Sequence, residues 1–191
     1  MNGKSYILAV SKPWALKAFM AVRPALPGNW SIVSTSNDLD AAIAGQRPRY
    51  IFFPHWSARV PETLTSEFEC VCFHMTDLPF GRGGSPLQNL IAHGYDKTML
   101  TALRMTQEVD AGPIYAKRPL SLDGSAAEVF ERAAPIVCEL IAAIVEQEPE
   151  PEPQTGAPSA FKRRTPDQSR ACLEAHGRVL LNSAGEVTGF M

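Results

Sequence analysis

The feature that most constrains the fold is an alternation of short apolar runs with segments of helical spacing. Three runs rich in β-forming residues occupy the first part of the chain, at 6–10, 30–34 and 50–53. Apolar residues at helical spacing lie between them, at 14–22 and 39–44. Strands that alternate with helices over short links are typical of a parallel sheet covered on both faces. The sequence therefore predicts an α/β fold with a Rossmann-like, doubly wound, mostly parallel sheet.

A histidine directly follows the fourth apolar run. The run 69–73 has the composition of a buried strand, and His74 stands where this strand is expected to end. Ligands of open α/β sheets bind outside the carboxyl ends of the strands. Three glycines within 81–84 then lead to a helix start at Ser85, where Gln88 can return a capping hydrogen bond. This order of a strand, a histidine, a glycine-rich loop and a helix is typical of an active site.

An acidic residue in the second half of the chain is expected to lie near the strand end at His74. The segments 98–105 and 114–120 are expected to be strands of a hairpin, and Asp110 lies in the connection between them. A capping box of Ser125 and Glu128 opens the longest helix, which is expected to end near residue 147. Its wide apolar stripe should cover one face of the sheet.

The chain is expected to contain one main domain and a short extension. Residues 1–148 form the domain, and residues 149–160 form a linker rich in Pro and Glu. Residues 161–191 form the extension, which is expected to contain a helix at 165–175 and a hairpin at 179–190.

The charge balance argues against a nucleic acid as the main partner. Eighteen Lys and Arg residues stand against 20 Asp and Glu, a formal net charge of −2, and the basic cluster 162–164 stands alone. The four cysteines form no Cys-x-x-Cys pair and have no histidine at zinc spacing, so neither a disulfide framework nor a metal site is expected. No signal peptide or membrane-spanning run is present, so we expect a cytoplasmic protein without a membrane partner. A homodimer remains compatible with the sequence.

The motifs around the histidine resemble those of the folate-dependent formyltransferases. These include methionyl-tRNA and glycinamide ribonucleotide formyltransferases and the sugar N-formyltransferases, and the likeness is greatest to the last. The family carries Asn-x-His-x-Ser-Leu-Leu-Pro, then Arg-Gly and a small residue before Pro, then Asp-x-Gly-x-Ile. The positions that match at the family's spacing are His74, Leu78, Pro79, Arg82, Gly83, Pro86, Asp110, Gly112 and Ile114. Two positions depart from the pattern, because Cys72 replaces the Asn and Asp77 replaces the usual Leu.

The resemblance implies a formyltransferase-type sheet in residues 1–148, and transfer of a formyl group from 10-formyltetrahydrofolate to a primary amine of a small acceptor. It favours a nucleotide-linked amino sugar, because the tRNA-acting members add a sizeable C-terminal domain, whereas only about 30 residues follow the linker here. Formyl transfer passes through a tetrahedral intermediate that bears an oxyanion and an ammonium. A histidine can move the proton, and a nearby carboxylate can orient it. We therefore expect His74 to be a general base or acid, with Asp110 as its electrostatic partner.

The resemblance also suggests which residues bind the two substrates. In the family, the loop after the third strand receives the folate, and the residues expected to do so here are Phe53, Pro54, His55, Trp56 and Val60. The residues expected to contact the acceptor are Thr76, Asp77, Arg82 and Gly83. Structural alternatives stay open: Trp56 can simply pack its loop, His55 can be a surface histidine, Arg82 can anchor the loop, and Asp77 can form a turn hydrogen bond.

The missing Asn leaves several functions open. In the family its amide donates to the formyl oxygen, and loss of one such donor can cost about 10²–10³ in rate. Cys72 is a poor donor. Protonated His74, Thr76, Gln88 or a backbone N–H of Gly83 or Gly84 can replace it. The alternative functions are those of a formyltetrahydrofolate hydrolase, a non-catalytic folate-binding relative and a diverged member that lacks an acceptor site.

Overall fold

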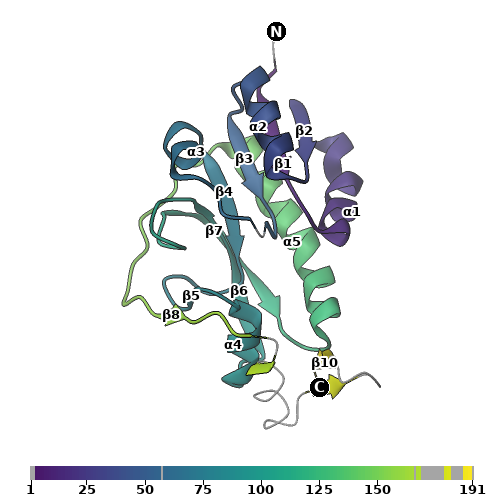
Figure 1. Cartoon of the computed structure of the whole chain (residues 1–191), viewed down its shortest axis with the longest axis vertical. Helices are drawn as coiled ribbons and strands as arrows, with labels where there is room; N and C mark the ends of the chain where they lie inside the picture. The colour runs from purple at the N-terminus through teal and green to yellow at the C-terminus, as the bar shows by residue number, and fades with distance from the viewer. Residues whose placement is uncertain (1–2, 57, 166, 169–178, 182–186, 191) are drawn as a thin grey trace.

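The computed structural model contains a single large sheet and describes residues 3–56, 58–165, 167–168, 179–181 and 187–190. Six strands form this sheet in the order β2-β1-β3-β4-β6-β7 (Figure 1). Their bounds are β1 Ser5–Ala9, β2 Asn29–Val33, β3 Tyr50–Phe53, β4 Cys70–His74, β6 Lys97–Arg104 and β7 Ile114–Ser121. Strands β2, β1, β3 and β4 pair in parallel, whereas β6 pairs antiparallel with both β4 and β7. The sheet is therefore mostly parallel, as the sequence predicts.

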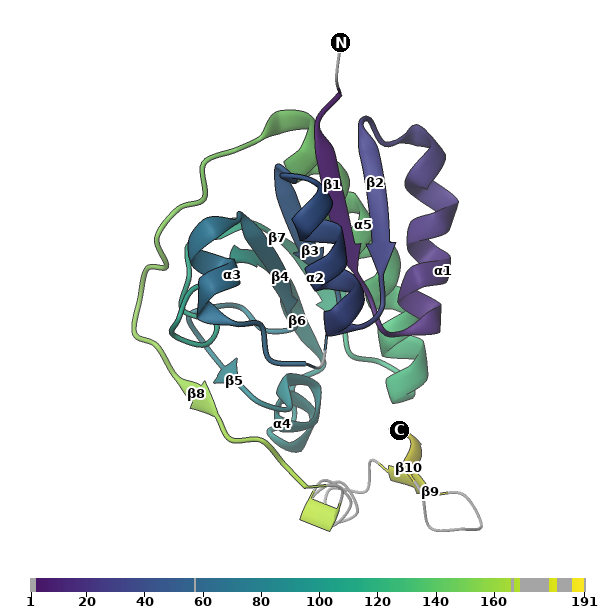
Figure 2. The ribbon, with the colours of Figure 1, turned by 45° about the horizontal axis from the view of Figure 1, so that its top comes forward.

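Helices cover both faces of the sheet (Figure 2). Their bounds are α1 Pro13–Val22, α2 Ser36–Gly45, α3 Glu62–Glu67, α4 Pro86–Ala92 and α5 Ala126–Gln147, with a 3₁₀ turn at Arg23–Ala25. Neighbouring residues of β1 point to opposite faces: Leu8 packs in the core under α1 and α5, and Ile7 packs in the core under α2 and α3. This arrangement confirms the doubly wound fold.

The longest helix forms as predicted. Ser125 accepts a hydrogen bond from the backbone of Glu128, whose side chain returns one to the backbone of Ser125. The apolar stripe of α5 is buried against the sheet, through residues that include Ala133, Val137, Leu140, Ile141 and Ile144. None of the described helices combines the length and the apolar character that crossing a bilayer requires.

After α5 the chain continues along the outside of the domain as a strap, which we define as residues 149–165 (Figure 2). Within the strap, β8 (Ala160–Phe161) pairs in parallel with β5 (Arg82–Gly83) of the glycine-rich loop. Most of the helix expected at 165–175 lies outside the described residues. Strands β9 (Val179–Leu181) and β10 (Val187–Phe190) pair antiparallel, as the expected hairpin requires.

Candidate active site

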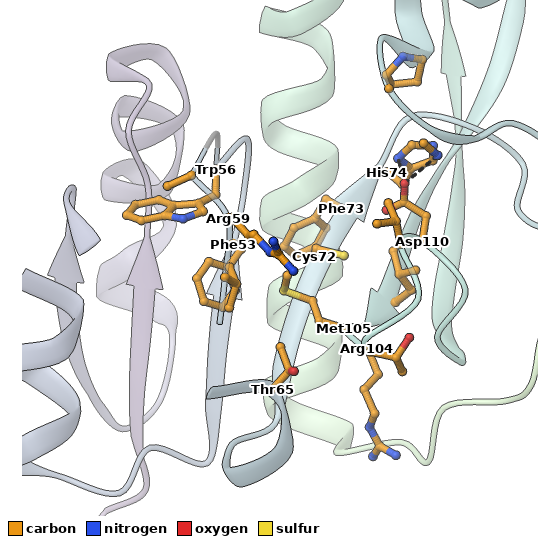
Figure 3. A pocket seen from close by; sticks show the side chains of 18 of the residues that line it. Phe53, Trp56, Arg59, Thr65, Cys72, Phe73, His74, Arg104, Met105 and Asp110 are labelled. Atoms are coloured by element: carbon orange, nitrogen blue, oxygen red, sulfur yellow. Dashed lines mark hydrogen bonds and ion pairs between the residues drawn. The ribbon is translucent and has the colours of Figure 1, made fainter. Parts of the chain in front are cut away.

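His74 is the last residue of β4, and the end of the sheet buries it. Its side chain is 8% exposed, and its backbone pairs with Thr101 of β6. The ring Nε2 lies 2.8 Å from the carbonyl oxygen of Gly81, and Nδ1 lies 3.4 Å from Oδ2 of Asp110 (Figure 3). Both ring nitrogens therefore face oxygen acceptors, and the two acceptors come from different loops.

Asp110 connects the hairpin to the glycine-rich loop. It lies between β6 and β7 with a φ of 53°, and its Oδ2 accepts a hydrogen bond from the backbone N–H of Gly83 at 2.9 Å. The loop needs glycine two residues later, because a Cβ on Gly112 would lie 1.9 Å from the carbonyl oxygen of Arg104. The Asp-x-Gly spacing thus brings one carboxylate oxygen to both His74 and Gly83.

The glycine-rich loop is shaped by the strap that packs on it. Gly83 has a φ of 97°, and a Cβ there would lie 2.6 Å from the carbonyl oxygen of Phe161. A Cβ on Gly84 would lie 2.7 Å from the Cβ of Arg163. The expected capping box is wrong: Ser85 has a φ of 53° and makes no side-chain cap to α4. Its hydroxyl instead accepts a hydrogen bond from the backbone N–H of Arg164 at 3.1 Å. The side chain expected to cap α4 therefore binds the strap.

A cavity of about 830 Å³ opens beside His74 and Asp110. Four of the five residues expected to bind folate line it, namely Phe53, His55, Trp56 and Val60. Figure 3 shows Phe53 and Trp56 among them. Pro54 is buried and is not among the lining residues. The sequence reasoning missed other lining residues, which include Arg59, Thr65, Arg104, Met105, Gln107, Val109 and Arg163. They come from the loop before α3, from α3, from the end of β6 and the connection that follows it, and from the strap. Val109 could have been found as the neighbour of Asp110, whereas no local pattern places α3 or the strap at this cavity.

Three of the four residues expected to contact the acceptor lie outside the cavity lining. Thr76 is fully buried and its hydroxyl faces the carbonyl oxygen of Gly81 at 3.4 Å. Asp77 pairs with Lys117 at 2.5 Å on the surface. Gly83 alone of the four lines the cavity.

The side chain of Arg82 anchors its loop. Its Nε and Nη2 donate to Oε1 of Gln154 at 3.1 and 2.8 Å, and its Nη1 pairs with Glu108 at 3.1 Å. These bonds agree with the alternative in which Arg82 anchors its loop, and they link the glycine-rich loop, the strap and the Asp110 loop.

Cys72 lines the cavity two residues before His74. Burial raises the pKa of the Cys72 thiol, and the negative charge of Asp110 raises this pKa further. The thiol is therefore protonated at neutral pH and serves neither as a nucleophile nor as a strong donor. The backbone N–H groups of Gly83 and Gly84 already donate to Asp110 and Phe161. Of the other candidate donors, Thr76 and Gln88 are not among the residues that line the cavity, whereas the ring of His74 lines it.

His55 forms part of the cavity wall as a neutral ring. It packs between Trp14 and Phe130, with ring centroids 4.4 and 5.6 Å away. Burial, with a smaller contribution from the charge of Lys12, lowers the pKa of His55 from 6.5 to about 4. The alternative of a surface histidine is therefore excluded.

Replacing His55 with asparagine is expected to reduce the acid sensitivity of the fold. The unfolded chain binds a proton at His55 below pH 6.5, whereas the folded chain binds it only below about pH 4. The free energy of unfolding therefore falls as the pH drops through this window, by about 3 kcal/mol in all. Asparagine tolerates the φ of 53° at this position and does not titrate. Urea unfolding at pH 7 and pH 4.5 measures the difference, and an equal fall in wild type and variant would contradict the assignment.

Known proteins similar to this chain share its fold and part of its sequence. No family model matches it. The methionyl-tRNA formyltransferase of Halorhodospira halophila is 34% identical over 103 residues, which span 50% of this chain and 33% of that protein. The matched part of this chain thus spans about a third of the length of this curated relative.

Two solved structures extend the comparison over most of the chain. The methionyl-tRNA formyltransferase from Clostridium thermocellum is 40% identical, with a TM-score of 0.82 over 86% of this chain and 74% of that chain. The formyltransferase PseJ from Anoxybacillus kamchatkensis was solved with UDP-4,6-dideoxy-4-formamido-L-AltNAc and tetrahydrofolate. It is 16% identical, with a TM-score of 0.63 over 84% of this chain and 86% of that chain, and so supports the fold alone.

Proposed function

This chain belongs to the folate-dependent formyltransferase family, and we propose that it transfers a formyl group from 10-formyltetrahydrofolate to a primary amine. The observation that carries the proposal is the pairing of His74 with Asp110 at the wall of a large cavity, outside the carboxyl end of β4. His74 and Asp110, two positions that match the family's motifs, thus meet at one cavity although 36 residues separate them in the sequence.

The cavity suits the pterin and formyl end of a folate. Its volume of about 830 Å³ lies in the range of small-molecule sites. The apolar side chains that line it, and against which a planar ring can pack, include Phe53, Trp56, Val60 and Met105. His74 and Asp110 lie across the cavity from Phe53 and Trp56 (Figure 3), and there we place the formyl group and the amine.

In the proposed reaction the amine nitrogen attacks the formyl carbon and forms a new C–N bond. The tetrahedral intermediate carries an oxyanion and an ammonium, and His74 stabilises the oxyanion by donating a hydrogen bond from Nε2, which exchanges the carbonyl oxygen of Gly81 for the oxyanion. The pair of His74 and Asp110 takes the proton from the ammonium and returns it to N10 as the bond from the formyl carbon to N10 breaks. The products are the formamide and tetrahydrofolate.

For the acceptor we favour an amino sugar linked to a nucleotide. Arg59 and Arg163 are exposed at the cavity and make no hydrogen bond or ion pair with other described residues. Two free guanidinium groups suit a diphosphate. PseJ provides a precedent, because its complex holds a UDP-linked formamido sugar. Methionyl-tRNA is the second candidate, favoured by the two relatives at 34% and 40% identity that carry this name.

Calorimetric titration with 5-formyltetrahydrofolate, a stable analogue of the donor, tests the folate site. Wild type is expected to bind with a Kd in the micromolar range, about that of a typical enzyme substrate. Trp56→Ala is expected to bind at least about tenfold more weakly, since it removes an aromatic wall of the cavity. Met20→Ala, an exposed residue of α1, is the matched control and should bind as wild type does. Absence of binding at about 1 mM ligand would exclude the proposed function.

Turnover assays then separate the remaining functions. A formylated product with an amino-sugar nucleotide or with methionyl-tRNA identifies the acceptor. Formate release without any acceptor identifies a hydrolase instead. Folate binding without either reaction identifies a non-catalytic relative.

A further inference from the structure

The strap contacts both loops that face His74. At its start, Glu152 forms a two-way backbone bridge with Ile114, at the beginning of β7. Further on, β8 pairs with β5 in the glycine-rich loop (Figure 2). A segment far from His74 in the sequence therefore lies against both sides of the candidate active site.

Gln154 uses its whole side-chain amide to join these loops. Its Nε2 donates to the carbonyl oxygens of Asp110 and Gly112, at 2.8 and 2.9 Å. Its Oε1 accepts two hydrogen bonds from the guanidinium of Arg82. Because a guanidinium only donates and a carbonyl only accepts, these partners permit a single orientation of the amide. The backbone of Asp110 is held by this amide in its left-handed conformation, with a φ of 53°.

Ser159 holds Gly81, whose carbonyl oxygen is the second acceptor that faces the ring of His74. Its hydroxyl accepts the backbone N–H of Gly81 at 2.8 Å, and the carbonyl oxygen of the same Gly81 faces Nε2 of His74. The backbone N–H of Ser159 donates to the carbonyl oxygen of Pro79 at 3.2 Å. Each ring nitrogen of His74 thus faces a residue that a side chain of the strap holds in place.

We propose that Gln154 is a positioning residue for formyl transfer, and that it acts by holding Asp110 against His74. This inference rests on the function proposed above. The physical reason is that catalysis depends on reacting groups held within fractions of an ångström, whereas Asp110 lies in a hairpin connection with a strained backbone. Ser159 supports the same geometry from the side of Gly81.

Two substitutions of Gln154 distinguish positioning of Asp110 from anchoring of Arg82. Gln154→Ala removes all four hydrogen bonds. Gln154→Glu keeps an acceptor for Arg82 but places a carboxylate oxygen against the carbonyl oxygens of Asp110 and Gly112. Both are expected to lower kcat by about 10²-fold with little change in the KM for folate, the size of effect that a displacement of about 1 Å can produce. A Gln154→Glu enzyme as fast as wild type would show that Gln154 serves Arg82 alone and would overturn the proposal.

Thr155→Ala is the matched control for these kinetics. Thr155 is the next residue of the strap, it is exposed, and its side chain makes no hydrogen bond with the described residues. Its replacement is expected to leave kcat within about twofold of wild type, as for surface substitutions in general.

Nuclear magnetic resonance of ¹⁵N-labelled protein, without folate or acceptor, tests the positioning independently of any turnover. Wild type and Thr155→Ala are expected to show a slowly exchanging Nδ1–H signal from His74, assigned by its absence from His74→Ala. Gln154→Glu is expected to lose this signal to exchange with water while the backbone amide spectrum stays folded. Should that variant fail to fold, Gln154→Ala replaces it, with the same Nδ1–H signal of His74 as the readout. The proposal would be overturned if the folded variant kept the slowly exchanging Nδ1–H signal, or if wild type lacked it. A failed formylation assay would instead argue against the proposed formyl transfer.

Discussion

Replacing His74 with asparagine is expected to lower kcat for formyl transfer by about 10³-fold, within the range that general acid–base catalysis contributes. The amide of asparagine can still donate to Asp110, but it cannot exchange a proton near neutral pH. The KM for 10-formyltetrahydrofolate is expected to stay within about twofold, because the apolar wall that binds the folate is intact. Steady-state formylation of the acceptor found in the turnover screen measures both constants.

His93→Asn is the matched control for this variant. The ring of His93 lies beyond α4, where its Nδ1 contacts the carbonyl oxygen of Asn89 at 2.6 Å, and His93 is not among the residues that line the cavity. The same chemical change there is expected to leave kcat within about twofold, as a surface substitution does. A His74→Asn enzyme that retains more than about a tenth of the wild-type kcat would exclude His74 as the group that moves the proton.

Replacing Cys72 with asparagine is expected to raise kcat by about 10²-fold, because one donor aimed at a developing oxyanion contributes about this much. The raised pKa of the Cys72 thiol keeps it a weak, neutral donor beside Asp110. Asparagine at this position matches the pattern that the formyltransferase family carries two residues before the histidine. Its amide would donate to the formyl oxygen from the wall of the cavity.

Cys72→Asp isolates the contribution of the donor. Aspartate has nearly the shape of asparagine, but when ionised it only accepts hydrogen bonds, and here it would face the carboxylate of Asp110. We expect this variant to be slower than wild type. A Cys72→Asn enzyme that is no faster than wild type, with its fold and folate binding unchanged, would contradict the prediction and would show that a side chain at position 72 adds nothing to the hydrogen bond from His74.

Much of the fold follows from local sequence patterns. The runs that become β1, β3 and β4 are apolar, and most of their residues are buried on both faces of the sheet. Such short apolar runs predict strands from local sequence alone. The capping box at Ser125 and the apolar stripe of α5 are equally local. Helix α3 has six residues, too few for a periodic pattern, and it was not predicted.

The proposed catalytic pair could be placed from the sequence because His74 and Asp110 match the formyltransferase motifs and stand at an expected strand end and hairpin connection. His74 ends β4, Asp110 lies in the connection between β6 and β7, and the antiparallel pairing of these three strands brings the two residues together. The acceptor residues could not be placed in the same way. Thr76 and Arg82 share their loop with Gly83, but burial and the strap direct their side chains away from the cavity.

The amino-acid sequence by itself determined the α/β architecture, the strand that ends at His74 and the loop that presents Asp110, because each of these elements has a local pattern of apolar and turn residues. Only the tertiary structure decided that Gln154 and Ser159 hold the two loops around His74. Their hydrogen bonds join residues between 42 and 78 positions apart. No local sequence pattern predicts the hydrogen-bond partners of a polar residue in a Pro-rich segment. Its hydrogen bonds form only after the fold has brought distant backbone groups within about 3 Å of it.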